Sequence, residues 1–200
     1  MRILAFDQSV RATAAVILEE VSDGQLSVVG QSVGRIGGSG IYRMMRLKFW
    51  IDEVFRKNDP FMVVREMHNQ RQFGAAAQLQ VVGAIIDQAA YENEFLDDYR
   101  YAVIPPGTWK KFCLGKGNLK KDTAYMIHIN RFIQNSSHLS ALPQFQVLDD
   151  NIGDAICLGV CAYVARRIAK NEPALISDAS RYNQLKKVLP TLFDYGEEVL

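Results

Sequence analysis

Three runs of apolar residues open the chain, and each is short enough for a β-strand. They cover residues 2–8, 12–21 and 25–36, and residues 22–24 (SDG) form a turn signal between the second and third runs. Apolar and β-branched residues in short runs separated by turn residues are typical of antiparallel strands. The pattern therefore predicts three antiparallel strands, and we expect the first to be central.

The next part of the chain predicts a helix followed by a buried strand. After a glycine-rich break at residues 37–40, apolar residues recur at helical spacing from Ile41 to Phe55, and Pro60 ends the pattern. Residues 61–66 (FMVVRE) are almost wholly apolar, which is typical of a strand covered on both faces. We expect this strand to lie parallel to the first one.

A helix predicted at residues 73–91 has small or apolar residues on nearly every side. Such a helix is buried either in the core of its own domain or against a second copy of the chain. Both interpretations stay open at this point, so the seam of a homodimer is one of two expectations.

The second half of the chain adds one strand and further helices. A fifth strand is predicted at residues 101–106, helices at 107–115, 120–133 and 149–170, and a polar loop at 135–147. This order predicts an α/β fold with a mixed five-stranded sheet, three antiparallel strands then two parallel, flanked by helices. We expect one domain over residues 1–170, with residues 171–200 as its C-terminal helical extension.

Composition agrees with one soluble domain. Of the 200 residues, 48% are hydrophobic, which suffices for one core, and no apolar stretch reaches membrane-spanning length. No signal peptide is recognisable, so we expect a cytoplasmic location: the cytoplasm or nucleoid of a host, or the matrix of an organelle. Cys113, Cys157 and Cys161 lack the spacing of paired metal ligands, which argues against disulfides and structural zinc. Cys157 and Cys161 lie four residues apart on a predicted helix, and we expect these two to be reduced core residues.

The net charge of +1 hides an uneven distribution of charges. Acidic residues crowd residues 87–98 and basic residues crowd another segment, so we expect an acidic face and a basic face. The basic residues are Lys110, Lys111, Lys116, Lys120 and Lys121. Glycines within residues 114–118 (LGKGN) would let the backbone approach a phosphate chain closely. This segment predicts contacts to the DNA backbone, with an ordinary solvated surface as the alternative.

Acidic residues stand at the ends of three predicted elements. Asp7 closes the first strand, Glu66 closes the strand at residues 61–66, and Asp154 lies near the start of the last helix. If the two strands pair, their ends lie side by side, and the helix can bring the third carboxylate over them. Asp7 alone would suit a turn, and Asp154 alone would suit a helix N-terminus. Together they predict a site for divalent cations.

The surroundings of Asp154 strengthen this interpretation. Residues 149–155 (DDNIGDA) bring three carboxylates together, and their mutual repulsion is unfavourable without a cation. Asp150 and Asn151 are weaker candidates for an auxiliary metal ligand. Because no His or Cys accompanies these residues, the set favours Mg²⁺, for which Mn²⁺ can substitute. Two such ions per site would support phosphodiester hydrolysis, and Lys121 would stabilise charge at the phosphate.

Two residues in the loop after Glu66 are candidates for contact with DNA. Arg71 and Phe73 lie where this loop would meet a substrate. The Phe73 ring would stack on bases or wedge between them, and a place in the core is the alternative.

Four motifs in this order resemble the RuvC-type Holliday-junction resolvases of the retroviral-integrase and ribonuclease-H superfamily. The motifs are ILAFDQSVRATAAVIL, VVREMHNQ, WKKFCLGKGNLKKD and DDNIGDAICLGVCAYVA, and the resemblance covers residues 1–167. It implies a Mg²⁺-dependent endonuclease of DNA recombination and repair that resolves four-way junctions as a homodimer, each subunit nicking one strand. It also implies that Asp7, Glu66 and Asp154 bind two Mg²⁺ ions, and that Lys110 and Lys121 are the family's two lysines.

The chain departs from this family at two positions. Asn151 stands where the family often has an acidic residue or His, which moves an auxiliary ligand to Asp150 or makes it an amide. Position 69 is Asn where the family has a wedge aromatic, which leaves Phe73 or none. These departures, together with the long gap before Asp149, suggest a divergent member of phage or organellar origin.

Other functions are weighed against this one. An RNA-processing nuclease of the same superfamily is the nearest alternative. The first motif also resembles the phosphate-binding opening of sugar kinases and other actin-like ATPases, which need a second such domain that 200 residues do not supply. A binding protein with the same fold but no catalysis is disfavoured by the intact Asp7, Glu66 and Asp154.

Overall fold

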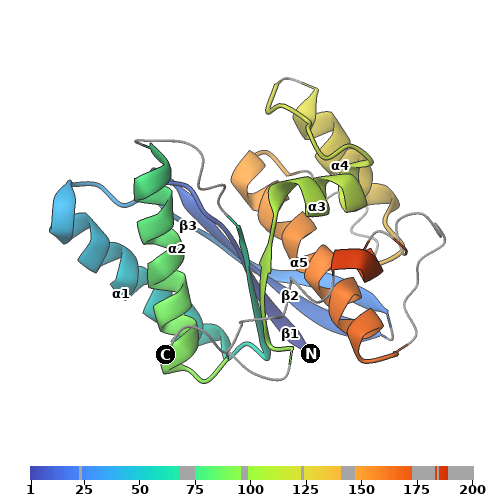
Figure 1. The fold of residues 1–200 in the computed structure, drawn as a ribbon, viewed down its shortest axis with the longest axis horizontal. Helices are drawn as coiled ribbons and strands as arrows, with labels where there is room; N and C mark the ends of the chain where they lie inside the picture. The colour runs from blue at the N-terminus through green and yellow to red at the C-terminus, as the bar shows by residue number, and fades with distance from the viewer. Residues whose placement is uncertain are drawn as a thin grey trace.

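Five strands form one mixed sheet in a computed structural model that describes residues 1–22, 24–67, 75–95, 99–122, 124–140, 147–172, 183 and 185–188. The strands are β1 (Arg2–Asp7), β2 (Thr13–Ser22), β3 (Gln25–Gly34), β4 (Met62–Glu66) and β5 (Tyr101–Ile104), in the spatial order β3-β2-β1-β4-β5. β1, β2 and β3 pair antiparallel, whereas β1 with β4 and β4 with β5 pair parallel. The predicted sheet and its central first strand are confirmed (Figure 1).

The register of β1 and β4 places the first two acidic residues. Phe6 pairs with Arg65, so Asp7 and Glu66 follow at the same edge of the sheet. Parallel strands run in the same direction, and their carboxyl ends therefore lie side by side. Arg65 supports this end of β4, because its guanidinium binds Asp87 and donates a 3.1 Å hydrogen bond to the main-chain oxygen of Glu66.

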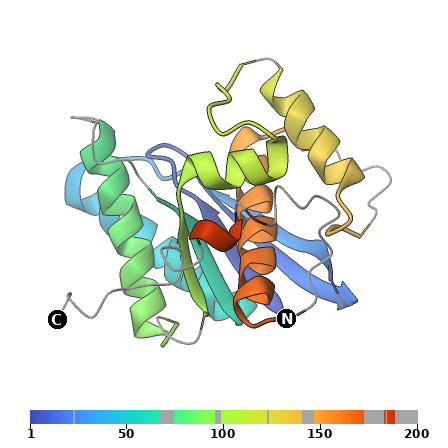
Figure 2. The ribbon, with the colours of Figure 1, turned by 45° about the vertical axis from the view of Figure 1, so that its right-hand side comes forward.

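Helices cover both faces of the sheet. α1 (Gly40–Asn58) and α2 (Ala75–Glu92) lie on one face, and α3 (Pro106–Leu114), α4 (Tyr125–Asn135) and α5 (Asp150–Ala169) lie on the other (Figures 1 and 2). Because successive strand residues point to opposite faces, Ile3 and Ala5 pack on the α5 side. Leu4 and Phe6 pack on the side of α1 and α2. The central strands β1 and β4 are thus covered on both faces, as residues 61–66 predicted for β4.

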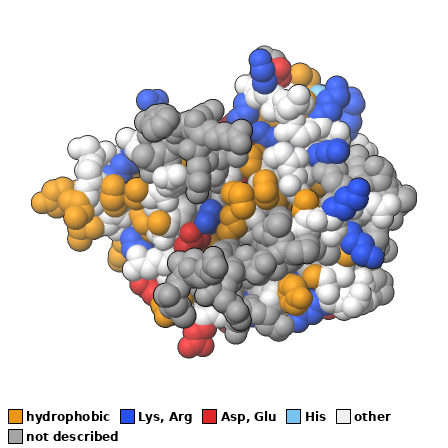
Figure 3. All heavy atoms as spheres, viewed as in Figure 1, with side chains coloured by type: hydrophobic (Ala, Val, Ile, Leu, Met, Phe, Trp, Pro, Cys, Tyr) orange, Lys and Arg blue, Asp and Glu red, His pale blue; other side chains and the backbone are white. Residues whose placement is uncertain are grey.

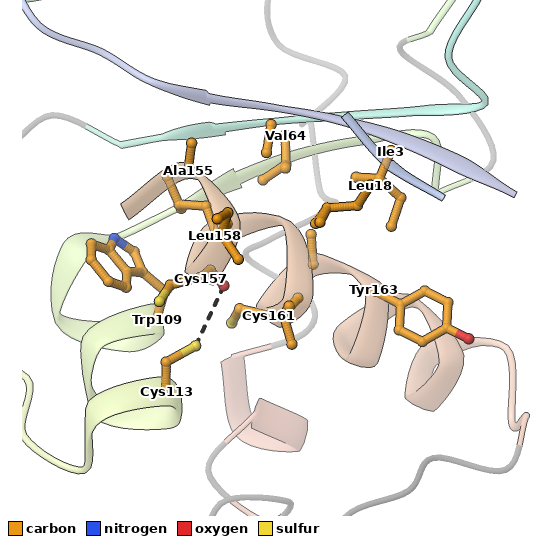
Figure 4. Packing of buried hydrophobic residues seen from close by; sticks show 14 of the residues in the cluster. Ile3, Leu18, Val64, Trp109, Cys113, Ala155, Cys157, Leu158, Cys161 and Tyr163 are labelled. Atoms are coloured by element: carbon orange, nitrogen blue, oxygen red, sulfur yellow. Dashed lines mark hydrogen bonds between the residues drawn. The ribbon is translucent and has the colours of Figure 1, made fainter. Parts of the chain in front are cut away.

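α5 packs directly on the sheet and is buried from Gly153 to Ile168. Gly159 permits this close approach, since a Cβ there would lie 2.3 Å from Leu18 Cδ1 and 3.3 Å from Ala5 Cβ. Figure 4 shows α5 beneath the strands, with Leu18 reaching toward it from β2. The position of α5 is therefore set by the absence of a side chain at residue 159.

The three cysteines lie in the core beside α5, as predicted for Cys157 and Cys161. Cys113, Cys157 and Cys161 are buried, and none of them is in a disulfide. The Cys113 thiol donates to the main-chain oxygen of Cys157 at 3.4 Å (Figure 4). Burial raises the pKa of Cys161 far above its usual range, so its thiol stays protonated. These residues contribute packing to the core.

Two predicted boundaries shift by a few residues. The helix predicted at residues 120–133 begins at Tyr125, because the Asp122 carboxylate accepts hydrogen bonds from the N–H groups of Ala124 and Tyr125. The fifth strand ends at Ile104, because Pro106 already belongs to the first turn of α3, where its missing N–H has no cost.

One face of α2 belongs to the core. Val82, Ile86, Ala89 and Ala90 are buried with apolar residues of β1 and α1, which agrees with the core interpretation of this helix. Of the predicted extension at residues 171–200, the structure describes seven residues, and Leu185 among them is buried against the α5 core. Among the described residues, no helix has both the length and the apolar character needed to cross a membrane.

Candidate active site

The first turns of α5 place Asp154 at the edge where β1 and β4 end. The Asp149 carboxylate caps the helix by accepting from the N–H groups of Asn151 at 2.9 Å and Ile152 at 3.4 Å. Asp150 and Asp154 follow one helical turn apart and therefore share a face of α5. The interpretation of Asp154 as a simple N-terminal acid is wrong, because it lies one turn further in and is 1% exposed.

Lys121 lies among the carboxylates at this edge. Its Nζ is 2.8 Å from Asp154 Oδ2, 3.1 Å from Asp150 Oδ2 and 4.0 Å from Asp7 Oδ2. Asp7 is 3% exposed and is thus almost as withdrawn from water as Asp154. Acidic groups from β1 and α5 therefore meet one basic group from the segment before α4.

The surroundings of Asp7, Glu66 and Asp154 disfavour their negative charges. Burial raises the pKa of Asp7, and the nearby charges of Asp154 and Glu66 raise it further. Burial likewise raises the pKa of Glu66, which a hydrogen bond from Trp109 only partly offsets. Burial raises the pKa of Asp154 as well, against the opposing influence of the Lys121 ammonium. Additional positive charge at this edge would stabilise the ionised carboxylates.

The Lys121 ammonium already supplies one such charge. Burial disfavours the charged form of Lys121, but the attraction of Asp7 and Asp154 prevails and raises its pKa above the usual value. The side chain therefore stays protonated at neutral pH. Three aspartate side chains face this single ammonium, so the cluster can attract a further cation.

Two aromatic residues that the sequence did not single out contact the carboxylates. The Trp109 indole Nε1–H donates to Glu66 Oε1 at 2.9 Å, and the Tyr125 hydroxyl donates to Asp154 Oδ1 at 2.6 Å. Lys110 Nζ lies 5.4 Å from the centre of the Trp109 ring and 5.3 Å from that of Tyr125. The predicted site residue Lys110 thus covers both rings, close enough for a cation–π interaction.

The other predicted lysines lie in the last turn of α3 (Lys111) and in the loop between α3 and α4 (Lys116 and Lys120). Lys111, Lys116 and Lys120 are exposed. A Cβ at Gly117 would lie 2.8 Å from the main-chain oxygen of Gly107, so this loop packs on the start of α3 through backbone atoms alone. Figure 3 shows basic side chains gathered on the side of the molecule that holds α4. The loop leads directly to Lys121 and joins the basic surface to the carboxylates.

The remaining predicted site residues differ in what they contact. Asp150 contacts Lys121, whereas Asn151 gives its main-chain N–H to the Asp149 cap. Arg71 and Phe73 lie outside the described residues. Within the acidic segment, Asp87 binds Arg65 and Glu92 binds Lys48, so part of the predicted acidic face is neutralised by ion pairs.

The donor set suits a hard divalent cation. Carboxylate oxygens are the ligands that Mg²⁺ and Mn²⁺ prefer, and the side chains around Lys121 are carboxylates. As they stand, the described residues include no group of three or more His, Cys, Asp or Glu side chains close enough to hold an ion. The Lys121 ammonium instead provides the positive charge at this place. The fit to a divalent cation rests on the negative charge and the oxygen donors of Asp7, Asp150 and Asp154.

Comparison with solved structures identifies the fold. RuvC of Thermus thermophilus aligns with a TM-score of 0.65 at 15% identity, over 86% of this chain and 97% of the RuvC chain. RuvC of T. thermophilus in complex with a Holliday junction substrate aligns with a TM-score of 0.67 at 15% identity, over 83% and 95% of the two chains. Ydc2, the yeast mitochondrial Holliday junction resolvase, aligns with a TM-score of 0.59 at 12% identity, over 95% and 84%.

These likenesses extend over most of this chain, while no family model and no curated protein matches its sequence. At identities of 12 to 15%, these structural likenesses establish the fold alone. The chain has the ribonuclease-H-like fold of RuvC. The resemblance to Holliday junction resolvases that the four motifs implied is confirmed at the level of the fold.

Proposed function

We propose that this chain is a Mg²⁺-dependent endonuclease that resolves four-way and related branched DNA junctions. The observation that carries this proposal is the meeting of Asp7, Asp150, Asp154 and Lys121 at the carboxyl edge of the β1 and β4 pair, with Glu66 beside Asp7. The fold shared with RuvC and Ydc2, whose structures are those of Holliday junction resolvases, supports branched DNA as the substrate.

In this proposal Asp7, Glu66 and Asp154 hold the cations, with Asp150 as an auxiliary ligand. When bound there, two divalent ions would supply activation of the attacking water and neutralisation of the scissile phosphate. Lys121 has a side chain that is 41% exposed, so it can turn from the carboxylates toward a phosphate oxygen. There its ammonium would stabilise the charge that develops during cleavage.

A panel of substrates tests this function. Four-way junction, flap, duplex, RNA–DNA hybrid and structured RNA are each incubated with the protein and Mg²⁺, and the products are mapped at nucleotide resolution. We expect paired, symmetry-related nicks in the four-way junction and little cleavage of duplex. Preferential cleavage of the hybrid or of structured RNA would favour the RNA-processing alternative, and cleavage of none would contradict the proposal.

The basic loop is proposed to bind the DNA backbone. Replacing Lys116 and Lys120 together with Ala should weaken junction binding and lower the slope of log Kd against log salt by about 2, since each lost phosphate contact lowers it by about 1. Fluorescence anisotropy across a salt series measures both quantities. Lys57→Ala, in the last turn of α1 on the other face of the sheet, is the matched control. An unchanged slope in the double variant would show that this loop does not contact the DNA backbone.

A homodimer is the proposed assembly, and α1 offers a surface for it. Ile41, Met45 and Phe49 recur four residues apart on one side of α1 and are 67%, 62% and 70% exposed. Figure 3 shows hydrophobic side chains gathered at the end of the molecule that holds α1. Exposed apolar side chains in contiguous groups are typical of association surfaces. Because α2 turns its buried face to the core, we place the proposed seam on α1 and the adjoining outer side of α2.

Two charges on this α1 surface should prevent dimerisation. We expect the Met45→Glu, Phe49→Glu double variant to sediment as a monomer where the wild-type protein sediments as a dimer, because the added carboxylates would be buried without partners. Val29→Glu introduces a charge at a similarly exposed apolar residue of the edge strand β3 and should leave the dimer intact. A wild-type monomer at micromolar concentration, with and without junction DNA, would refute the homodimer.

A further inference from the structure

In Asp154 and Glu66, two of the three site carboxylates, the two oxygens of the carboxylate differ in their partners. Tyr125 donates to Oδ1 of Asp154, and Lys121 binds Oδ2. Trp109 donates to Oε1 of Glu66, which leaves Oε2 of Glu66 for another partner. Each of these two carboxylates therefore accepts, through one oxygen, a hydrogen bond from an aromatic side chain. In Asp154 the second oxygen, Oδ2, faces the Lys121 ammonium.

The two aromatic donors are held rigidly by their surroundings. Trp109 is 0% exposed and Tyr125 is 1% exposed, and both belong to the core beside α5. Figure 4 shows Trp109 extending from α3 against the start of α5, next to Ala155. Close-packed side chains of this size cannot rotate without disturbing their neighbours. The hydrogen bonds that they donate therefore have a fixed direction.

We propose that Trp109 and Tyr125 are positioning residues, which orient Glu66 and Asp154 so that Oε2 and Oδ2 are presented to the divalent cation. This assignment rests on the proposed function, because it concerns the same site. Lys121 also binds Oδ2 of Asp154 and would compete with a cation for it, whereas Tyr125 donates to Oδ1. Groups that hydrogen-bond to metal ligands in this way fix the ligand's orientation, and their loss typically lowers metal affinity about 10- to 100-fold.

A purely structural role for these rings predicts a different result, and Tyr163 provides the comparison. Tyr163 is also 1% exposed, and its hydroxyl donates to Glu20 rather than to a site carboxylate. Tyr163→Phe and Tyr125→Phe each delete one buried hydroxyl and keep the ring. Both should lower thermal stability, since each removes a hydrogen bond from a buried tyrosine to a carboxylate. Only Tyr125→Phe should alter metal binding.

Isothermal titration calorimetry with Mn²⁺, in the absence of DNA, tests the assignment. We expect Tyr125→Phe to raise the Kd for Mn²⁺ about tenfold and Tyr163→Phe to leave it at the wild-type value. Trp109→Phe, which removes the indole N–H, serves as a second variant and should also weaken Mn²⁺ binding. Equal Kd values in the wild type, Tyr125→Phe and Trp109→Phe would overturn the assignment.

The same titration separates this assignment from the proposed function. A wild-type protein that binds Mn²⁺ and cuts junctions, with unaltered Mn²⁺ affinity in both aromatic variants, would overturn the positioning role alone. A wild-type protein that binds no Mn²⁺ would overturn the metal-dependent function and the positioning role together. The melting temperature of each variant, measured in parallel, confirms that the titrated protein is folded.

Discussion

Asp154→Asn is expected to lower the rate of junction cleavage by about 10³-fold or more while leaving junction binding largely intact. The substitution keeps the size of the side chain and an oxygen that can still accept from Tyr125, but it removes the negative charge that faces Lys121. Because the proposed cations are held by charge, the loss acts on cation binding and on catalysis together. Single-turnover cleavage and anisotropy measure the two effects separately.

Asp149→Asn is the matched control for this prediction. It makes the same change in charge on the residue that caps the same helix, and Asn caps a helix about as well as Asp does. The N-cap hydrogen bonds of α5 should therefore survive, and cleavage should stay near the wild-type rate. Asp7→Asn and Glu66→Gln should behave like Asp154→Asn. Normal cleavage by all three variants would show that the site has been assigned to the wrong residues.

Much of the site followed from the sequence, because strand ends and helix starts are local features. Residues 2–8 and 61–66 are apolar runs with a carboxylate at or near the end, and parallel pairing then places Asp7 and Glu66 side by side. The acidic start of the last helix likewise has a local signature. Whether Asp149 or Asp150 caps that helix was not decided by the pattern, and with the cap at Asp149 the residue Asp154 lies beyond the first helical turn.

The aromatic donors had no such local signature. Trp109 lies 43 residues from Glu66, and Tyr125 lies 29 residues from Asp154, so neither contact is visible as a spacing. An aromatic residue on an amphipathic helix predicts a core position, and both rings are indeed in the core. Their polar atoms reach the carboxylates only because α3 and α4 pack beside α5. Buried Trp and Tyr usually find a partner for their polar atom, and here the site provides it.

The placement of Asp154 depends further on small residues that let α5 lie close to its neighbours. A Cβ at Gly153 would meet Ile129 Cγ2 at 2.7 Å, and one at Gly159 would meet Leu18 Cδ1 at 2.3 Å. The first contact brings α5 against α4, which carries Tyr125, and the second brings it against β2. Site geometry and core packing are therefore determined by the same helix.

Gly159→Val should destabilise the protein by about 1–3 kcal/mol, the usual result of overpacking a core. Leu18 and Ala5 are both 0% exposed and have no free space into which to withdraw, so α5 must shift or Leu18 must leave its rotamer. A fall in melting temperature of about 2–4 °C for each kcal/mol is expected at this chain length. A shift of about 1 Å in α5 would also displace Asp154 and lower cleavage about 10²-fold.

Thermal melting and single-turnover cleavage of the same preparations measure both effects. Gly37→Val is the control, because no atom lies within 4 Å of a Cβ built at Gly37. Leu18→Ala removes the atoms that the introduced valine side chain would meet, so a double-mutant cycle should show the two substitutions costing less together than the sum of each alone. If Gly159→Val melts like the wild type, or if the two substitutions are additive, then close packing at Gly159 does not hold α5 in place. The location of Asp154 would in that case depend on the Asp149 cap and on the contact with α4.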